Sequence, residues 1–345
     1  MAELVQIDAF MELSANFPVV DVRSPAEFLH GHIPGAVNVP LFDDHERKIV
    51  GTNYKQVNRE AAVYAGLEFA GRKLAKLVKE GEKKAGNEKT LLLHCWRGGM
   101  RSKSMAWLFE TIGLTCYLLD GGYKSYRHHV RDTMSRPFSL RVIGGRTGSG
   151  KTAILHQLER MGEQVVDLEA LAHHKGSAFG ALGEEEQPST EQFENNLYRV
   201  LAGLDREKHI WIEDESRNIG KCVIPGELYE QMRISATYFL DIPLEERAKC
   251  LVEEYASHDQ GELKACVEKI QRKLGGERTR TAIESIEKKQ FFTTAMITLQ
   301  YYDKAYMHSL EKNHSCYHVI LSNTVDPVAN AALLQQHNSQ EVKKG

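Results

Sequence analysis

Short apolar runs recur along the chain, and amphipathic stretches separate them. In the first part of the chain, the runs cover residues 18–23, 91–94 and 115–119, and a further short run ends at Pro40. In the second part, they cover residues 139–143, 164–167, 209–213, 237–241 and 317–321. Apolar positions with helical spacing cover 59–85, 102–111, 153–161 and most of 244–312, where interruptions are expected at Gly261 and at Gly275-Gly276. Strands that alternate with helices in this way predict an α/β fold.

The chain is long enough for two domains. Its 345 residues exceed what one hydrophobic core usually supports. The first α/β pattern ends near Pro137 and a second begins at once, so we predict domains at residues 1–136 and 137–345. The second would carry a helical insertion or extension at about 244–312. The polar tail from about Gln335 is expected to fray.

Composition is that of a globular protein, with 42% hydrophobic and 26% charged residues. No apolar run approaches the length of a membrane span, and the start, MAELVQIDAF, lacks the basic and apolar segments of a signal peptide. We therefore expect a cytoplasmic protein with no membrane partner. The cysteines lie far apart with no CxxC pair, which argues against a zinc site and a disulfide framework; they are Cys95, Cys116, Cys222, Cys250, Cys266 and Cys316.

One cysteine lies in a setting that suits chemistry. Cys95 follows the apolar run 91–93 and opens the loop Cys95-Trp96-Arg97-Gly98-Gly99-Met100-Arg101-Ser102. A loop that closes from Cys95 round to Arg101 can direct backbone N–H groups into its centre and form a cradle for one phosphate-sized anion. These groups and the two arginines favour the thiolate. A buried structural cysteine would not need them, whereas both sulfur-type transfer and cysteine-dependent phosphatase chemistry fit the loop.

A second loop matches the phosphate-binding pattern GxxxxGK[ST] at every fixed position: Gly145-Arg146-Thr147-Gly148-Ser149-Gly150-Lys151-Thr152. A predicted strand precedes it and a predicted helix follows it, which is the context that the pattern requires. The glycines let backbone N–H groups surround a phosphate, Lys151 can contact phosphate oxygens, and Thr152 can hold Mg²⁺. The pattern does not distinguish ATP, GTP and another diphosphate.

Acidic residues at the end of a neighbouring strand usually accompany such a loop. Glu213-Asp214-Glu215 follows one predicted strand, and we select Asp214 as the carboxylate on the metal side, with Glu213 or Glu215 as substitutes. Asp167, which follows another apolar run, is a second candidate. The segment His173-His174-Lys175-Gly176-Ser177 has the polarity of a substrate loop.

The formal charge of −3 conceals an internal division. Residues 97–151 contain ten Lys or Arg and three Asp or Glu, a local charge of +7 that leaves −10 for the rest of the chain. Tyrosines and histidines lie among the basic residues between positions 123 and 129, a composition that suits a phosphate backbone and unstacked bases. An ordinary solvated surface together with phosphate-binding loops explains the same charge equally well.

Several blocks of the sequence resemble known families. Asp21-Val22-Arg23, Glu27-Phe28, residues 31–36 and the six-residue loop opened by Cys95 resemble a rhodanese domain, a family that carries a sulfane sulfur on a cysteine. With the P-loop added, the chain is similar to the bacterial tRNA 2-selenouridine synthase family. Further matching blocks extend this resemblance over nearly the whole chain; they lie at 51–56, 121–124, 167–169, 176–180, 213–217, 219–220 and 301–303.

The resemblance implies an N-terminal rhodanese-like α/β domain followed by a P-loop NTPase-like α/β domain with a helical C-terminal part. It implies that selenium from selenophosphate replaces the sulfur of wobble 2-thiouridine in tRNA, after S-geranylation by geranyl diphosphate. Cys95 would be the essential selenium-handling thiol. Arg97, Gly98, Gly99 and Arg101 would bind selenophosphate, and residues 145–152 would bind the diphosphate of the prenyl donor or another phosphate ligand.

The implied partners are the anticodon arm of a tRNA that contains 2-thiouridine and, as a donor source, a selenophosphate synthase. Both steps act on one uridine, which must leave its base stack. We therefore predict that the basic segment between the two loops holds the anticodon arm through Lys124, Arg127 and Arg131. Two other functions fit the motifs: a nucleotide-dependent kinase with a rhodanese regulatory domain, and a non-enzymatic RNA-binding adaptor, against which an activated thiol argues.

Overall fold

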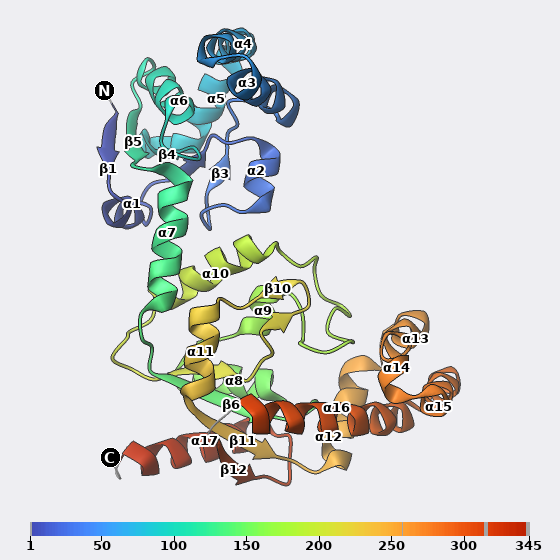
Figure 1. Cartoon of the computed structure of the whole chain (residues 1–345). Helices are drawn as coiled ribbons and strands as arrows, with labels where there is room; N and C mark the ends of the chain where they lie inside the picture. The colour runs from blue at the N-terminus through green and yellow to red at the C-terminus, as the bar shows by residue number, and fades with distance from the viewer. Residues whose placement is uncertain (1, 257, 314–316, 343–345) are drawn as a thin grey trace. The chain divides into compact units, whose positions relative to one another are not determined.

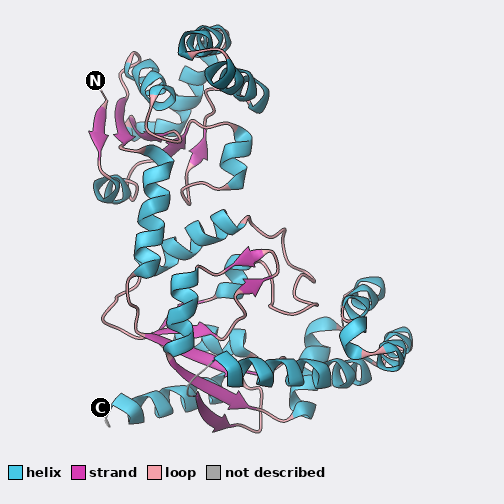
Figure 2. Cartoon of the chain, viewed as in Figure 1, coloured by secondary structure: helices cyan, strands magenta, loops and turns pink. Residues whose placement is uncertain are grey.

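The computed structural model describes residues 2–256, 258–313 and 317–342, so Cys316 lies outside the described residues. The chain divides into two compact units, one of Met1–Thr133 with Glu194–Arg199 and one of Met134–Phe193 with Val200–Gly345. Each unit contains its own parallel sheet (Figure 1), and Figure 2 shows helices flanking both sheets. Within the described ranges, no helix has the length and apolar character needed to cross a bilayer.

The first unit is built on a five-stranded parallel sheet with the order β1-β5-β4-β2-β3. Every residue of the central strand β4 is buried. A strand that is covered on both faces has a continuous apolar run instead of an alternating one, as Leu91-Leu92-Leu93 shows. The strands are β1 (Glu3–Val5), β2 (Val19–Asp21), β3 (Val37–Asn38), β4 (Thr90–His94) and β5 (Thr115–Leu119).

Helices connect these strands. A capping box between Ser24 and Glu27 starts α2, and Pro25 occupies its first turn. Met105 and Phe109 of α6 pack with β4 residues in the core of this unit. The helices are α1 (Ile7–Leu13), α2 (Pro25–His30), α3 (Asp44–Gln56), α4 (Arg59–Gly71), α5 (Leu74–Ala85), α6 (Met100–Glu110) and α7 (Gly122–Ser135), with a 3-10 turn, η1, at Gly86–Glu88.

The second unit has a parallel sheet with the order β12-β11-β6-β8-β7. Because β6 and β8 are parallel neighbours, the P-loop after β6 and the acidic run after β8 emerge at the same edge of the sheet. The strands are β6 (Leu140–Gly145), β7 (Gln164–Val166), β8 (Ile210–Glu213), β11 (Ala236–Asp241) and β12 (Tyr317–Leu321), and β9 (Asn218–Ile219) pairs antiparallel with β10 (Cys222–Val223).

A helical region extends the second unit beyond its sheet. Three helices, α13 to α15, surround an apolar cluster that includes Leu263, Val267 and Ile286, and α16 packs against α12 and α15 (Figure 1). The helices that follow β6 are α8 (Lys151–Arg160), α9 (Leu168–Ala172), α10 (Thr190–Ala202), α11 (Gly226–Ile234), α12 (Leu244–Tyr255), α13 (Gln260–Lys269), α14 (Gln271–Leu274), α15 (Gly276–Glu287), α16 (Phe291–Asn313) and α17 (Pro327–Val342). The middle of α10, Glu194–Arg199, groups with the first unit.

The predicted α/β class is confirmed, and every strand expected from an apolar run is present. The helical spacing expected over 59–85 is confirmed, but the chain breaks at Arg72-Lys73 into α4, which packs on α3, and α5, which packs on β4 and α6. One straight helix could not serve both partners. The strand β1 and the helices α3 and α7 were not predicted, since β1 is only three residues long and α3 is strongly polar. The apolar positions of α7 do have helical spacing, at Tyr123, Tyr126, Val130 and Met134, but basic residues lie between them.

Two helix boundaries in the second unit also differ from the prediction. The interruption expected at Gly261 lies just before it, between the end of α12 at Tyr255 and the start of α13 at Gln260, because Asp259 accepts hydrogen bonds from the backbone N–H groups of Gly261 and Glu262. The expected fraying from Gln335 is wrong for residues 335–342, since α17 continues to Val342, and residues 343–345 lie outside the described residues. Gln335 donates to Glu163 at 2.8 Å, and Leu334 is buried in the core of this unit.

Candidate functional sites

The Cys95 loop lies where β4 leaves the sheet. Cys95 directly follows the last residue of β4, and α6 begins at Met100. The backbone N–H groups of Tyr123 and Lys124 donate to the carbonyls of Cys95 (2.8 Å) and Trp96 (3.0 Å), which fastens this loop to the start of α7. Gly98 has φ +63°, and a Cβ there would lie 2.8 Å from the Leu119 carbonyl oxygen. The position of the thiol is therefore fixed by the ends of two neighbouring strands.

The Cys95 thiol accepts two hydrogen bonds in a nearly closed environment. Its residue is 3% exposed, and the Gly99 N–H and the Ser102 hydroxyl each donate to Sγ at 3.3 Å. Burial by itself would raise the pKa of Cys95, but the hydrogen bonds from Ser102 and the charge of Arg101 outweigh it, so the pKa lies below its usual value. These contacts favour the thiolate, which is the nucleophilic form.

The two arginines of the loop have different environments. Arg97 is exposed. Arg101 donates to both oxygens of Glu27, at 2.7 and 3.4 Å, and Glu27 also accepts from Arg47 at 3.3 Å. Glu27 and Arg47 line an open hollow of about 460 Å³ with the α3 lysines Lys48 and Lys55. The structure thus leaves Arg97 facing solvent, while Arg101 acts on the thiol from within an ion pair.

The predicted RNA-contacting residues on α7 also separate. Lys124 and Arg131 are exposed. Arg127 is 6% exposed and donates to Asn195 at 2.5 Å and to Glu194, both in the Glu194–Arg199 segment that groups with the first unit. Arg127 therefore supports the fold of this unit, and nucleic-acid contact stays a prediction for the two exposed residues.

The P-loop is folded as its pattern requires. Gly148 and Gly150 have φ values of +80° and +72°, and a Cβ on Gly148 would lie 2.8 Å from the Arg247 carbonyl oxygen. The next residue, Lys151, begins α8, and its ammonium donates to the Gly145 carbonyl at 3.3 Å. Gly145 N–H donates in turn to the Tyr306 hydroxyl at 3.0 Å. The loop thereby presents the N-terminus of a ten-residue helix, which favours an anion.

A buried arginine supports the P-loop from behind. Arg247 is 2% exposed and donates to the Thr147 carbonyl at 3.0 Å. It also donates to both oxygens of Asp303, at 2.8 and 2.7 Å. Arg146 points elsewhere, because it pairs with Asp241 at 2.5 Å at the end of β11. The P-loop contains two basic residues, Arg146 and Lys151. Of these, Lys151 is the one that lies close to the carboxylates of Glu213 and Glu215.

The two acidic residues selected from the sequence are occupied by other partners. Asp214 accepts from Arg233 at 2.6 Å and from the Tyr306 hydroxyl at 2.7 Å. Asp167 caps α9 through the Ala170 N–H and pairs with His156 at 2.8 Å. Both line the cavity in front of the P-loop.

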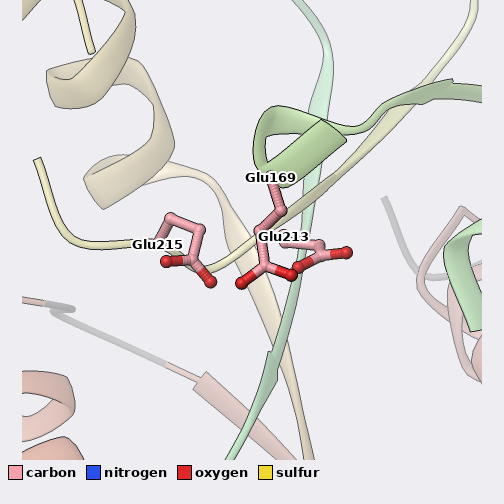
Figure 3. Close-up of side chains that lie close together, drawn as sticks. All are labelled: Glu169, Glu213 and Glu215. Carbon is pink, nitrogen blue, oxygen red and sulfur yellow. The ribbon is translucent and has the colours of Figure 1, made fainter. Parts of the chain in front are cut away.

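Other carboxylates approach the P-loop instead. The Thr152 hydroxyl donates to Glu169 at 3.1 Å, and one carboxylate oxygen each from Glu169, Glu213 and Glu215 lie within 4.8 Å of one another (Figure 3). Burial and the neighbouring carboxylates raise the pKa of Glu215 to about 8 and that of Glu213 well above its usual value. Burial lowers the pKa of Lys151, but Glu215, Glu213 and Glu169 raise it more, so this lysine stays charged.

The spacing of the three glutamates beside the P-loop is a sequence signal that was not used to predict them. Side chains alternate along a strand and its extension, so residues 213 and 215 point to one side and 214 to the other. In the second segment, Asp167 is the N-cap, and Glu169 in the first turn of α9 faces Thr152. The neighbours Arg233, Arg247 and Tyr306 come from distant helices and gave no local pattern.

A large cavity lies in front of the P-loop. Its volume is about 970 Å³, and the predicted substrate loop contributes Lys175, Gly176 and Ser177 to its wall. A second, narrow hollow of about 50 Å³ shares Thr147, Ser177, Leu251 and Tyr302 with it. The remaining walls of the hollow are mainly apolar and come from α12, α13, α15, α16 and the segment between α9 and α10; they include Phe179, Leu263, Ile286, Phe291 and Ala295.

Comparison with known proteins agrees with a chain that carries a Cys95 loop in its first unit and a P-loop in its second. A family model described as "tRNA 2-selenouridine synthase AAA domain" matches residues 138–339, and one described as "Rhodanese-like domain" matches residues 7–129. The curated "tRNA 2-selenouridine synthase" of Bdellovibrio bacteriovorus is 37% identical over 351 residues, which cover 87% of this chain and 90% of that protein. The chain belongs to the tRNA 2-selenouridine synthase family.

Other relatives carry the same name. The Marinobacter nauticus protein is 31% identical over 100% of this chain and 96% of its own length. The Nitrosomonas europaea protein is 40% identical over 70% of this chain, a match that spans 64% of that protein. These matches confirm the predicted order of a rhodanese-like α/β part followed by the P-loop part that is typical of tRNA 2-selenouridine synthases.

Proposed function

We propose that this protein modifies tRNA by replacing the sulfur of wobble 2-thiouridine with selenium. The observation that carries the proposal is the Cys95 thiol, which has a lowered pKa and lies in a loop with donors aimed at its sulfur. Relatives that match over most of this chain are named for the same product. In the proposal, selenophosphate binds at Arg97, Gly98, Gly99 and Arg101, and a selenophosphate synthase supplies it.

The second unit prepares the sulfur to leave. Sulfur bound to C2 of the uridine is a poor leaving group, and we propose that the protein first transfers a geranyl group to it from geranyl diphosphate. The P-loop suits the diphosphate, and the adjoining hollow has the apolar lining that suits a hydrocarbon chain, but its side chains must move apart to admit one, because its volume of about 50 Å³ is smaller than a geranyl group. A P-loop bordered by an apolar hollow is easier to explain with a prenyl diphosphate than with a nucleotide, whose base and ribose are polar.

Both steps balance without an added oxidant or reductant. In the first step the thiouridine sulfur attacks C1 of the geranyl group, the C1–O bond breaks and diphosphate leaves. In the second, the selenium of selenophosphate held at the Cys95 loop forms a bond to C2 of the ring, and the C2–S bond breaks so that geranylthiol leaves with a proton. Water then cleaves the Se–P bond and releases phosphate, which leaves 2-selenouridine. Positioning the uridine and the nucleophile together replaces a collision between separate molecules.

Mass spectrometry of wobble nucleosides tests both steps in one experiment. A 2-thiouridine tRNA is incubated with the full chain and geranyl diphosphate, and then with selenophosphate. We expect S-geranyl-2-thiouridine after the first addition and 2-selenouridine after the second. Lys151→Ala should abolish the first product, and Cys95→Ser should allow it but abolish the second. A fully active Cys95→Ser protein would overturn the mechanism.

A nucleotide-dependent kinase is the competing function, because acidic groups lie beside the P-loop. Nucleotide turnover distinguishes the two. Rapid hydrolysis of ATP or GTP that a small hydroxyl compound stimulates would favour the kinase. Binding of geranyl diphosphate without such turnover would favour the transferase.

A further inference from the structure

Three glutamates from two segments of the second unit meet beside the phosphate-binding loop. Glu213 is the last residue of β8, Glu215 lies two residues further along, and Glu169 lies in the first turn of α9. Figure 3 shows their carboxylates turned toward a common space, and one oxygen of each lies within 4.8 Å of the others. Like charges at this spacing repel strongly unless a cation lies among them.

Glu213 provides an independent observation that points to a ligand. It is 0% exposed, and among the described residues neither of its carboxylate oxygens has a hydrogen-bond partner. A buried carboxylate without a donor is costly, so buried charges are normally paired or coordinate a metal. Gly176 closes the other side, since a Cβ on it would lie 2.6 Å from a Glu215 oxygen and 2.9 Å from a Glu169 oxygen.

The surrounding charges match a divalent ion. The ammonium of Lys151 offsets one of the three carboxylates electrostatically, while the nearby Asp214 is already paired with Arg233 at 2.6 Å. The cluster with Lys151 therefore keeps two negative charges when all three glutamates are ionised. One divalent cation would neutralise it.

The ligand atoms narrow the choice of metal. The cluster offers only carboxylate oxygens, with the Thr152 hydroxyl beside Glu169. Oxygen ligands suit Mg²⁺, Ca²⁺ and Mn²⁺, whereas Zn²⁺ and Cu²⁺ sites usually include nitrogen or sulfur. In an octahedron with Mg–O bonds of about 2.1 Å, opposite oxygens lie about 4.2 Å apart, so the observed spacing needs only a small contraction.

We propose that Glu169, Glu213 and Glu215 bind one divalent cation such as Mg²⁺ or Mn²⁺, and that they bind it before any phosphorylated ligand arrives. Asp214, the residue selected from the sequence, does not take part, because Arg233 and Tyr306 occupy its oxygens. A cation at this place adjoins Thr152 and the P-loop, where it would meet the phosphate oxygens of a bound ligand. The site lies within the second unit and does not depend on the proposed reaction.

Mn²⁺ titration of the full chain, followed by the electron paramagnetic resonance of free Mn²⁺, tests the site without phosphate or tRNA. We expect one saturable site, and Glu213→Gln should weaken it by about tenfold or more. Glu184→Gln is the matched control, because Glu184 lines the same cavity but lies outside the cluster and close to Lys175, at 3.6 Å. It should leave the affinity unchanged within about twofold.

Thermal unfolding shows whether the variant is folded. In EDTA, Glu213→Gln should unfold at or near the wild-type temperature, since it removes a buried carboxylate whose oxygens have no hydrogen-bond partner, but it should lose the rise in Tm that Mn²⁺ causes in the wild type. If this variant does not fold, Glu215→Gln provides the same comparison. Absence of a saturable site in the wild type, or unchanged Mn²⁺ affinity in a folded Glu213→Gln or Glu215→Gln protein, would overturn the proposal. Because activity is not a readout, failure of the proposed reaction would not affect this result.

Discussion

Gly122 approaches Cys95 so closely that no side chain fits between them. Its φ is +62°, and a Cβ on Gly122 would overlap the carbonyl oxygen of Cys95 and the backbone nitrogen of Gly98. Both atoms belong to the loop that surrounds the thiol. The first turn of α7 therefore acts as the wall against which this loop is shaped.

Gly122→Ala should consequently damage both stability and the thiol site. The positive φ and the overlap together should cost about 2 kcal/mol or more of unfolding free energy. The displaced loop should also weaken the hydrogen bonds to Cys95 and slow its alkylation. Gly113→Ala is the control, since Gly113 has φ +82° but nothing within 4 Å of a Cβ. Urea unfolding and alkylation rates measure both effects, and equal losses in the two variants would show that the close approach is unimportant.

The pH dependence of alkylation should distinguish Cys95 from the other buried thiols. Its pKa is lowered, whereas burial raises the pKa of Cys116 to about 12 and that of Cys222 to about 11. Since the thiolate reacts, the rate at Cys95 should reach half its maximum at lower pH than for an ordinary thiol, and the other two should stay nearly inert at neutral pH. Peptide mass spectrometry after timed iodoacetamide treatment measures each site.

Ser102→Ala directly tests what lowers the pKa of Cys95. Without the Ser102 hydroxyl, Cys95 loses a hydrogen bond that stabilises its charged form, so its half-maximal rate should move to higher pH. The fold should be retained, because alanine is serine without its hydroxyl group and fits in the same space. An alkylation profile that does not move would show that this hydroxyl does not tune the thiol.

Residues on α7 give a test of nucleic-acid binding. Lys124 and Arg131 are exposed, so Lys124→Gln and Arg131→Gln should each weaken tRNA binding and reduce the slope of log K against log salt by about 1. Lys83→Gln, an exposed change on α5, should leave the slope unchanged. Arg127→Gln should chiefly lower stability, because Arg127 is buried against Glu194 and Asn195. An unchanged slope in both α7 variants would exclude this surface.

The sequence was most informative where one short segment determines both structure and chemistry. The P-loop and the Cys95 loop each consist of consecutive residues after a buried strand, so local pattern sufficed to locate them. Strand positions followed from apolar runs for the same reason. Polar helices such as α3 were missed because their apolar positions are few, and the tertiary contact with α4 supplies what periodicity does not show.

The partners of each site were harder to predict, because they depend on distant contacts. Asp214 has the residue type expected of the acidic partner, yet it is bound by Arg233 from α11 and Tyr306 from α16. Glu169 reaches Thr152 because of where β7 ends relative to β6, which only the strand order determines. The strand order of the sheet must therefore be known before one of the adjacent carboxylates can be chosen as the acidic partner of the P-loop.

The proposed geranyl transfer would place the prenyl chain in the apolar hollow beside the P-loop, and this placement predicts how chain length is selected. Phe291 lines this hollow, so Phe291→Ala should lengthen it and raise the relative use of farnesyl over geranyl diphosphate about tenfold. Phe292→Ala is the matched control, because the neighbouring Phe292 is 41% exposed and does not line the hollow. Competition between the two diphosphates, with the transferred chains identified by mass spectrometry, measures the ratio. Inorganic diphosphate should bind all three proteins equally, since the P-loop is untouched; a ratio that changes as much in Phe292→Ala would show that the chain lies elsewhere.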